Sequence, residues 1–567
     1  MKKIILLLTV CCFFTQWSVG QTPKWLEKSK RAVFSVITYD KENNILNNGN
    51  GFFVTENGVA LSDYSSFKGA ERAVVIDSDG KQMPVDVILG ANSMYDVVKF
   101  RVNTGGKKVT SLPLALTPPA VDEEVYLMAY STQKERLFTP GKVKEVSNIG
   151  EEKYYYTLEL KMTDKMANCP VMTADGKVFG IAQQASAKDA ETLCYAVGIS
   201  YAMSLEISAL SLSDFVLRSI GIKKGLPENE EQALVFLYMA SSQVTAGEYE
   251  TLLADFINEY PNSPDGYVRR AEYYVYQVNN DAAYEKASAD LAKALSVTEK
   301  KDDVHFNTSK IIYNYQLTHP ENTYKDWTID KALEEIQKAI AINSIPIYIQ
   351  MEGDIYFAKK DFSAAYASYE KVFDTNITSP AVYYSAAKAK ELMEADPKEV
   401  LALMDSCIAH CPKPISYENA AYLLERAQLY MDTEQYRQAM IDYDSYYNAV
   451  SGNVNDVFYY YREQASFHAR QFQRALDDIV KAIELNPEEV MYHVELGVIN
   501  LRVGRYEEAI NALNKSLTIA PEYAEAYRLI GICQVQLKQN DAACASFAKA
   551  KELGDTAVDA LIEKHCK

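Results

Sequence analysis

The side chains that carry out nucleophilic chemistry in proteins are unevenly distributed along this chain. All six histidines lie in its second half, at His305, His319, His410, His468, His493 and His565. Residues 25–215 contain Ser65, Asp96 and Cys169 but no histidine. Because a serine or cysteine nucleophile needs a base to take its proton, composition excludes a Ser–His or Cys–His mechanism within this segment. A Ser–Lys pair, such as Ser65 with Lys68, is the alternative left to it.

A metal site is the second chemistry to consider. In "CIAHC", the side chains of Cys407, His410 and Cys411 share one face of a predicted helix. No second Cys or His pair lies nearby, so we interpret the two cysteines as buried small side chains. GxxxxGK, HExxH, CxxC and EF-hand spacings are all absent from the sequence. The sequence therefore predicts no metal and no cofactor.

The first twenty residues, "MKKIILLLTVCCFFTQWSVG", have the organisation of a secretory signal peptide. Two lysines precede an apolar run from Ile4 to Phe14, and small residues stand before a cleavage point after Gly20. A lipoprotein signal with Cys11 or Cys12 acylated is the alternative. No later segment approaches the ~18 apolar residues of a transmembrane helix. We predict an exported protein in a bacterial periplasm.

Two disulfides are candidates in an oxidising compartment. Cys169 and Cys194 could be bridged, or could equally be two buried free thiols. Cys533 and Cys544 fall on paired helices and form the second candidate pair. An 11-residue spacing with the wrong facing would keep their Cα atoms beyond the ~7 Å limit of a disulfide.

The net charge and the length of the chain limit which partners and how many domains we expect. The chain has 567 residues, with 58 Lys plus Arg against 77 Asp plus Glu, for a net charge of −19. A nucleic-acid backbone would be repelled, and we find no basic stripe that could offset this. At ~150 residues per domain the length allows three or four domain-sized units, or one domain joined to a long repeat array.

The composition and the spacing of apolar residues change near residue 220. Before it, short alternating runs such as "RAVFSVITYD" and "EVYLMAY" are separated by Asn-Gly and Asp-Gly turns, which predicts an all-β sandwich or barrel. After "GIKKGLPENEEQA" glycine becomes rare, and Ala, Tyr, Leu and Glu recur at helical spacing.

A fixed period appears in the helical half. Ala475, Ala509 and Ala543 are each 34 residues apart, and Gly497 and Gly531 repeat at the same step. One helix of a pair needs a small residue where the other crosses it, so this pattern is that of a tetratricopeptide repeat. We expect a signal peptide at 1–20, a β domain at 25–215, a linker at 216–232, a solenoid at 233–554 and a capping helix at 555–567.

The β half resembles the trypsin-like serine proteases of the HtrA type. "GNGFFVTENGVALS", "YDVVKFRV", "CPVMTADGKVFGI" and "YAVGISYAMS" match the framework strands of that family. The resemblance implies a double β-barrel and places the family's catalytic aspartate on Asp96. It places the histidine on Ser65 and the serine on Ala167, so the triad is degenerate. The glycines around the serine become Lys165, Asn168 and Cys169.

Counting within the repeats gives a candidate partner groove. Positions that line the concave face of such a solenoid are mostly apolar here, which favours capture of an apolar or aromatic-bearing segment. The alternative is that these side chains fill a tightly wound superhelix. The candidates are Val457, Tyr460, Phe467, Met491, Val494, Val498, Leu501, Ile532 and Val535.

Three functions follow from this organisation. The first is a protein-binding scaffold with an inactive trypsin-like domain and a solenoid that holds protein or peptide partners. The second is a divergent serine peptidase whose active site the register misplaces. The third is an envelope assembly factor that acts through the solenoid alone. The sequence does not indicate an oligomeric state.

Overall fold

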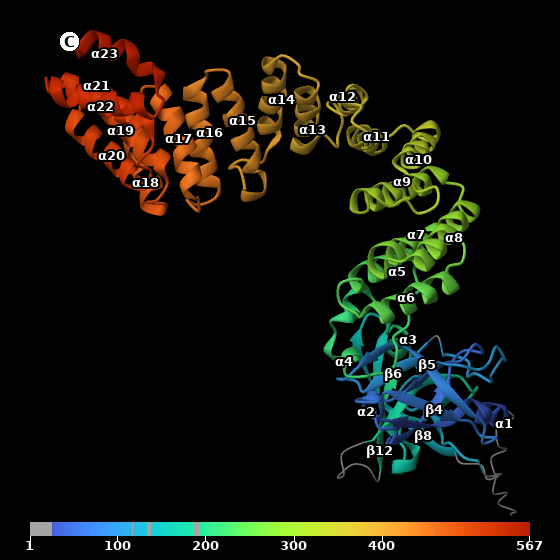
Figure 1. The fold of residues 1–567 in the computed structure, drawn as a ribbon. Helices are drawn as coiled ribbons and strands as arrows, with labels where there is room; N and C mark the ends of the chain where they lie inside the picture. The colour runs from blue at the N-terminus through green and yellow to red at the C-terminus, as the bar shows by residue number, and fades with distance from the viewer. Residues whose placement is uncertain (1–24, 116, 133–137, 185–191, 567) are drawn as a thin grey trace, which may run out of the picture. The chain divides into compact units, whose positions relative to one another are not determined.

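The computed structural model describes residues 25–115, 117–132, 138–184 and 192–566 (Figure 1). The predicted signal peptide and the alternative acylation sites Cys11 and Cys12 lie outside the described residues. Within the described residues, no helix combines the length and apolar composition needed to cross a membrane. Contacts divide the chain into two compact units, up to Thr298 and from Glu299 onward, and each is described by itself.

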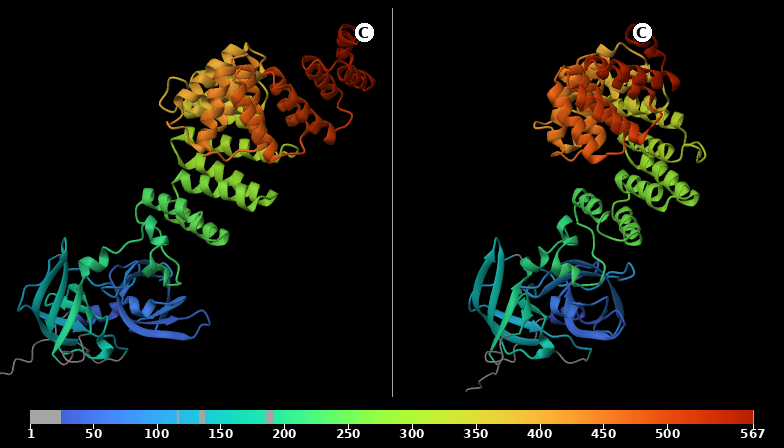
Figure 2. Two further views of the ribbon diagram at one scale, coloured as in Figure 1. Left: turned by 90° about the vertical axis from the view of Figure 1, so that its left-hand side faces the viewer. Right: turned by 60° about the vertical axis from the view of Figure 1, so that its left-hand side comes forward.

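Two closed antiparallel barrels of six strands each begin the first unit (Figure 2). Barrel 1 has the strand order β1-β2-β3-β6-β5-β4 and barrel 2 the order β10-β11-β12-β9-β8-β7. Barrel 1 consists of β1 Val33–Tyr39, β2 Ile45–Phe53, β3 Val59–Ser62, β4 Arg72–Ile76, β5 Gln82–Asn92 and β6 Val97–Val102. Barrel 2 consists of β7 Glu124–Met128, β8 Phe138–Gly150, β9 Lys153–Glu159, β10 Pro170–Thr173, β11 Val178–Gln183 and β12 Leu193–Gly198. The predicted double β-barrel is confirmed.

Alternation of buried and less buried residues forms the strands. In β1, the side chains of Val33, Phe34, Val36 and Thr38 are fully buried, and the other three residues of the strand are less buried. Inside barrel 1 the ring of Phe34 packs on Phe53 at a centroid distance of 4.8 Å. Burial of these apolar side chains supplies most of the favourable free energy of this core.

Short helices accompany the barrels, and longer helices follow them. The short ones are α1 Leu26–Ser29, α2 Tyr64–Phe67, α3 Ile199–Met203 and α4 Phe215–Arg218. The first unit ends with α5 Glu230–Ala240, α6 Ala246–Glu259, α7 Pro264–Tyr273 and α8 Asp281–Val297. Residues 219–225, in the segment expected to be a linker, are hydrogen-bonded to barrel 1: Gly69 N–H donates to Ser219 O and Ile88 N–H to Lys223 O.

The second unit is an array of helix pairs that pack each helix on its neighbour in sequence. Its helices are α9 Lys301–Thr318, α10 Ile329–Ile342, α11 Pro346–Ala358, α12 Phe362–Glu370, α13 Pro380–Leu392, α14 Pro397–His410, α15 Ala421–Asp432, α16 Tyr436–Ala449, α17 Asp456–His468, α18 Phe472–Leu485, α19 Val490–Arg502, α20 Tyr506–Ile519, α21 Ala524–Gln536, α22 Asn540–Glu552 and α23 Asp559–His565. The predicted all-α solenoid is confirmed.

The repeat needs a small residue where its two helices cross. A Cβ added at Gly353, Gly497 or Gly531 would come within 2.7 Å of a ring or leucine carbon on the following helix. That neighbour, 16 residues later, is Tyr369, Leu513 or Phe547. Glycine at these positions therefore sets the distance between paired helices, as its period predicts.

The turn inside each pair needs one left-handed residue. Lys360, Glu434, Arg470, Gly504 and Lys538 each lie five residues before the small alanine of the next helix, and each has a φ between 58° and 81°. Only one of the five is glycine, so the other four repeats tolerate a left-handed side chain at a cost of about 1 kcal/mol.

The cysteine pairing differs from the prediction. Cys544 is bonded to Cys566, and Cys533 is buried and free, so the candidate bridge between Cys533 and Cys544 is not formed. Ala543, on α22, is fully buried where this helix packs against α21. Its neighbour Cys544 is rotated by about 100° around the helix and meets the segment that follows α22. Cys169 and Cys194 are both buried free thiols.

Candidate functional site

A polar cluster forms between the two barrels and includes Ser65 and Asp96, two of the positions that the resemblance assigns to the triad. Asp63 is the N-cap of α2, where its carboxylate accepts hydrogen bonds from Ser66 N–H at 2.8 Å and Ser66 Oγ at 2.6 Å. This cap fixes the first turn of α2, which presents Ser65 on its exposed side.

Ser65 and Asp96 are in direct contact. Both Ser65 N–H and Ser65 Oγ donate to Asp96 Oδ1, at 2.7 and 2.8 Å. Asp96 ends the turn before β6 with a φ of 47°, a left-handed conformation that aspartate tolerates better than most residues. Its carboxylate thus accepts a backbone hydrogen bond from the first turn of α2, 31 residues earlier in the chain.

Two asparagines join this cluster to barrel 2. Asn168 Nδ2 donates to Asp63 Oδ1 at 2.7 Å, and Asn168 itself has a φ of 65°. From β2, Asn50 Nδ2 donates to the carbonyl oxygens of Ala167 at 2.9 Å and Lys165 at 3.1 Å. Asn50 thus links Ala167 to barrel 1, and Asn168, the residue after Ala167, is linked to Asp63.

The backbone around Ala167 is committed to local hydrogen bonds. The amide N–H groups of residues 166–169 all donate to backbone carbonyls, with the acceptors Thr163, Asp164, Ala182 and Met166 in turn. A group that stabilises an oxyanion needs N–H donors aimed at the reacting atom. None of these four N–H groups has that freedom in the structure.

The nearby thiols are poorly suited to act as nucleophiles. Burial raises the pKa of the Cys169 thiol to about 12 and that of Cys194 to about 12. The thiolate is the reactive form of cysteine, and both groups are protonated at neutral pH. Cys194 Sγ donates to the Tyr195 carbonyl oxygen at 3.2 Å, as a small packed side chain would.

Sequence reasoning missed the parts played by Asp63, Asn50 and Asn168. Asp63 stands three residues before Ser66, which is the spacing of a helix N-cap, and that signal could have found it. The hydrogen bond from Asn168 to Asp63 joins residues 105 positions apart, so no local sequence pattern predicts it.

The "CIAHC" segment lies at the end of α14. Cys411 Sγ donates to the Cys407 carbonyl oxygen at 3.4 Å, and the His410 ring lies 4.7 Å from that of Tyr383. Both cysteines are buried. Among the described residues, no group of three or more His, Cys, Asp or Glu is arranged to hold a metal ion.

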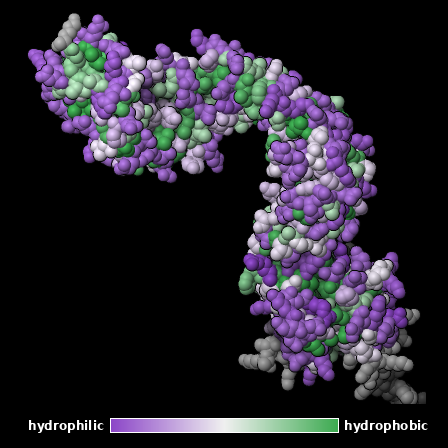
Figure 3. All heavy atoms as spheres, in the orientation of Figure 1, coloured by the Kyte–Doolittle hydropathy of each residue, from purple (hydrophilic) through white to green (hydrophobic). Residues whose placement is uncertain are grey.

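Four of the nine predicted groove residues line one hollow of about 570 Å³ in the second unit. Phe467 comes from α17, Val498 and Leu501 from α19, and Ile532 from α21. Arg470 and Arg502 line the same hollow, and neither forms an ion pair with any described residue. Figure 3 shows hydrophobic side chains among hydrophilic ones on the visible face of these C-terminal helices.

The other five predicted groove residues lie in different environments, from the core to the surface. Val494 is only 2% exposed and packs in the core with Leu513 and Ala526, so its assignment to a surface groove is wrong. The register count placed it at an outer position, but α21 covers it. Val457 is 42% exposed, the Tyr460 ring packs on Tyr492, Met491 is half-buried, and Val535 packs against the cluster around Phe547.

A buried carboxylate lies beside this hollow. Glu463, on α17, is 0% exposed; its Oε2 accepts from Gln464 Nε2 at 2.7 Å, and its Oε1 has no hydrogen-bond partner among the described residues. Burial, and next the charge of Glu495, raise the pKa of Glu463 to about 8. It stands 16 residues before Ile479, the position that is glycine in three other repeats.

Comparisons with known proteins agree with this division of the chain. Residues 49–181 match a family model described as "Trypsin-like peptidase domain". Residues 415–516 match the model "Anaphase-promoting complex, cyclosome, subunit 3". Among solved structures, the active form of the Rv3671c protease from M. tuberculosis is 16% identical, covers 35% of this chain and 86% of its own, and has a TM-score of 0.28.

Curated relatives match the helical part. A TPR repeat-containing protein of Methanocaldococcus jannaschii, MJ1428, is 24% identical over 236 residues, which are 41% of this chain and 40% of the relative. The SGT1 homolog of Bos taurus is 29% identical over 87 residues, 15% of this chain and 26% of the relative. The chain thus spans less than half the length of each of these relatives.

Proposed function

This chain joins a trypsin-like peptidase domain to tetratricopeptide repeats, and from that premise we propose an exported protein-binding scaffold whose trypsin-like domain does not hydrolyse peptide bonds. The proposed limits are 25–215 for that domain and 233–554 for the repeats. Export rests on the basic and apolar pattern of residues 1–20. A periplasmic location fits the same pattern.

The contact between Ser65 and Asp96 carries the proposal of inactivity. It supports the register in which Ser65 stands at the histidine position, because an imidazole there would meet the same carboxylate. Ser65 supplies a hydroxyl that is already donating, and Ala167 supplies a methyl group where a nucleophile is needed. Residues 25–215 hold no histidine that could take over as the base.

A fluorophosphonate probe tests this directly. We expect the mature protein to resist labelling and to leave casein uncleaved. Ala167→Ser should also remain unlabelled, because a serine without a base is a weak nucleophile at neutral pH. Active trypsin serves as the positive control. Labelling that one substitution within 25–215 abolishes would identify a functional nucleophile and refute the proposal.

The solenoid is the proposed binding part. Repeat arrays of this kind use extended surfaces to hold partners. The hollow lined by Phe467, Val498, Leu501 and Ile532 supports an apolar or aromatic-bearing protein segment as its occupant. An envelope assembly factor that works through the solenoid alone remains the alternative, and it would need no contribution from the barrels.

Three substitutions to aspartate separate a groove from a core. Val498→Asp should weaken binding of aromatic-bearing peptides while the melting temperature holds, since Val498 lines the hollow. Val480 is 41% exposed on α18, and Val480→Asp should change neither property. Val494→Asp buries a charge and should cost several kcal/mol. If Val498→Asp unfolds the protein as Val494→Asp does, the side chain is core and the groove is refuted.

A further inference from the structure

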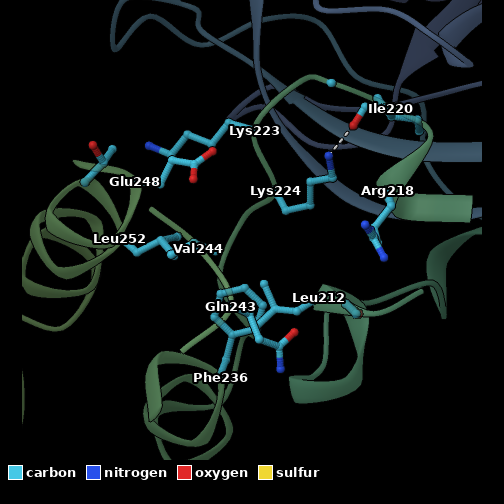
Figure 4. Close-up of a pocket in the computed structure, with 13 residues that line it drawn as sticks. Leu212, Arg218, Ile220, Lys223, Lys224, Phe236, Gln243, Val244, Glu248 and Leu252 are labelled. Carbon is cyan, nitrogen blue, oxygen red and sulfur yellow. Dashed lines mark hydrogen bonds between the residues drawn. The ribbon is translucent and has the colours of Figure 1, made fainter. Parts of the chain in front are cut away.

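A second cavity, of about 540 Å³, lies in the first unit, where the segment after the barrels faces α5 and α6 (Figure 4). Its size falls in the range of ~300–1,000 Å³ that small-molecule pockets occupy. It shares no residue with the polar cluster of the barrels or with the hollow of the second unit.

One wall of this cavity is apolar. Leu212, Phe236, Val244 and Leu252 line it, from the 3-10 turn Ala209–Leu212, from α5, from the α5–α6 connection and from α6. The 3-10 turn and α4 also carry Leu210, 71% exposed, and Phe215, 79% exposed. A cavity wall made of apolar side chains is typical of a site that receives an apolar ligand.

The charged groups of the cavity leave a positive excess. Lys223 is neutralised by Asp255, with Nζ and Oδ2 2.5 Å apart, and Glu248 is held by the Thr245 hydroxyl at the start of α6. Arg218 lines the cavity and is exposed, and its guanidinium has neither an ion pair nor a hydrogen bond to any described residue. The Arg218 guanidinium is therefore available to an anion that enters the cavity.

Lys224 is the second cation. Its ammonium group donates to the carbonyl oxygens of Ile220 and, at 2.9 Å, Ile222, which leaves one of its three N–H donors unassigned. Partial burial lowers the pKa of Lys224, and the nearest opposing charge is that of Glu71. An anion in the cavity would restore the electrostatic balance that burial disturbs.

We propose that this cavity binds an apolar monocarboxylate. Its carboxylate meets Arg218 and the remaining donor of Lys224, and its apolar body lies against Phe236, Val244 and Leu252. A guanidinium fork matches a carboxylate with two parallel hydrogen bonds, which an ammonium alone cannot do. The side-chain amide of Gln243, which has no partner among the described residues, lies at the same cavity.

Two sources supply this chemistry, an acyl chain and the C-terminus of a peptide with an apolar last residue. Titration calorimetry of the full mature protein with dodecanoate and with N-acetyl-Leu-Phe distinguishes them. Binding of only one acid assigns that source, and binding of both leaves the shared chemistry as the determinant. The neutral counterparts, dodecanol and N-acetyl-Leu-Phe-amide, should bind roughly tenfold or more weakly than the acids.

Variants locate the site. Arg218→Gln should weaken binding of the acid roughly tenfold or more and bring it to the level of the neutral counterpart. Arg31→Gln removes another exposed arginine of the same unit and should leave the affinity unchanged. Val244→Trp fills the cavity without removing a charge and should abolish binding, with circular dichroism as the check on folding. The proposal is overturned if neither acid binds saturably, if acid and neutral compound bind equally, or if Arg218→Gln binds as the parent does.

Discussion

Asp63 in the barrels and Glu463 in the repeats are both buried carboxylates, but they differ in how many hydrogen bonds they accept. Between the barrels, Asp63 is 5% exposed and accepts hydrogen bonds from Ser62, Ser66 and Asn168. In the repeats, Glu463 is fully buried, accepts from Gln464 alone and leaves one oxygen without a partner among the described residues. Burial raises the pKa of both groups, but only around Asp63 do several donors oppose that rise.

The difference follows from the donors that lie within reach of each position. The barrels bring together residues that are far apart in sequence, so a carboxylate can collect donors from both. A repeat offers mainly the helix before and the helix after, and Glu463 stands at a crossing where three other repeats have only glycine. A buried ionisable group there is costly in stability, and Glu463 is therefore a weak point in an otherwise regular array.

The same substitution, carboxylate to amide, should have opposite effects in the two regions. The larger effect is expected at Glu463. Its pKa of about 8 in the folded state lies above the ordinary value of 4.5, so the unfolded chain ionises first as pH rises. The contribution of Glu463 to stability is therefore most favourable below pH 4.5, falls as pH rises from 4.5 to 8, and is level above that, for a total change of about 5 kcal/mol.

Glu463→Gln removes this dependence. The variant should match the parent near pH 4 and exceed it in free energy of unfolding by up to about 5 kcal/mol at pH 8 and above. Thermal unfolding followed by circular dichroism at 222 nm, measured at both ends of this range, checks the sign. Glu488→Gln changes an exposed glutamate of the neighbouring repeat and is the matched control. An advantage that does not grow with pH would mean that Glu463 is ionised and paired after all.

Asp63→Asn should destabilise the barrels by about 2 kcal/mol. The new amide must turn an NH₂ group toward donors that now point at a carboxylate, so at least one buried hydrogen bond is lost. Denaturant unfolding followed by the near-ultraviolet signal of the tyrosines and Trp25 measures it. Asp86→Asn, at a less buried aspartate of β5, provides the comparison. A neutral Asp63→Asn would remove the contrast between the two regions.

The smallest effect is expected at Ser65. Ser65→Ala removes one hydroxyl bond to Asp96 and keeps the bond from its backbone N–H, so about 0.5–1 kcal/mol should be lost. Ser66→Ala removes a buried hydroxyl bonded to Asp63 and should cost more. Equal losses from the two substitutions would show that exposure does not govern the strength of this network.

Much of the fold is visible in the sequence because it depends on local periods. The 34-residue step of Ala475, Ala509 and Ala543 fixes the helix pairs, and alternation with Asp-Gly turns fixes the strands. The contact of Ser65 with Asp96 was also accessible, through framework strands on either side of each residue.

Other features depend on rotation about a helix axis or on distance in the chain, which sequence spacing does not encode. A turn of about 100° decides whether Cys544 meets Cys533 or Cys566, and the same uncertainty moved Val494 from the core to a surface in our count. The Asp63–Asn168 bond and the cavity at Arg218 join segments whose proximity only the fold creates.

The bond between Cys544 and Cys566 has a consequence for the order in which the array comes apart. Linear arrays tend to lose structure from their ends, where each repeat has only one neighbour. Here the disulfide joins two cysteines 22 residues apart and holds α23 against α22, so the last two helices cannot unfold from the array one at a time. Under oxidising conditions α22 and α23 must therefore leave the array together, whereas reduction would allow α23 to leave first.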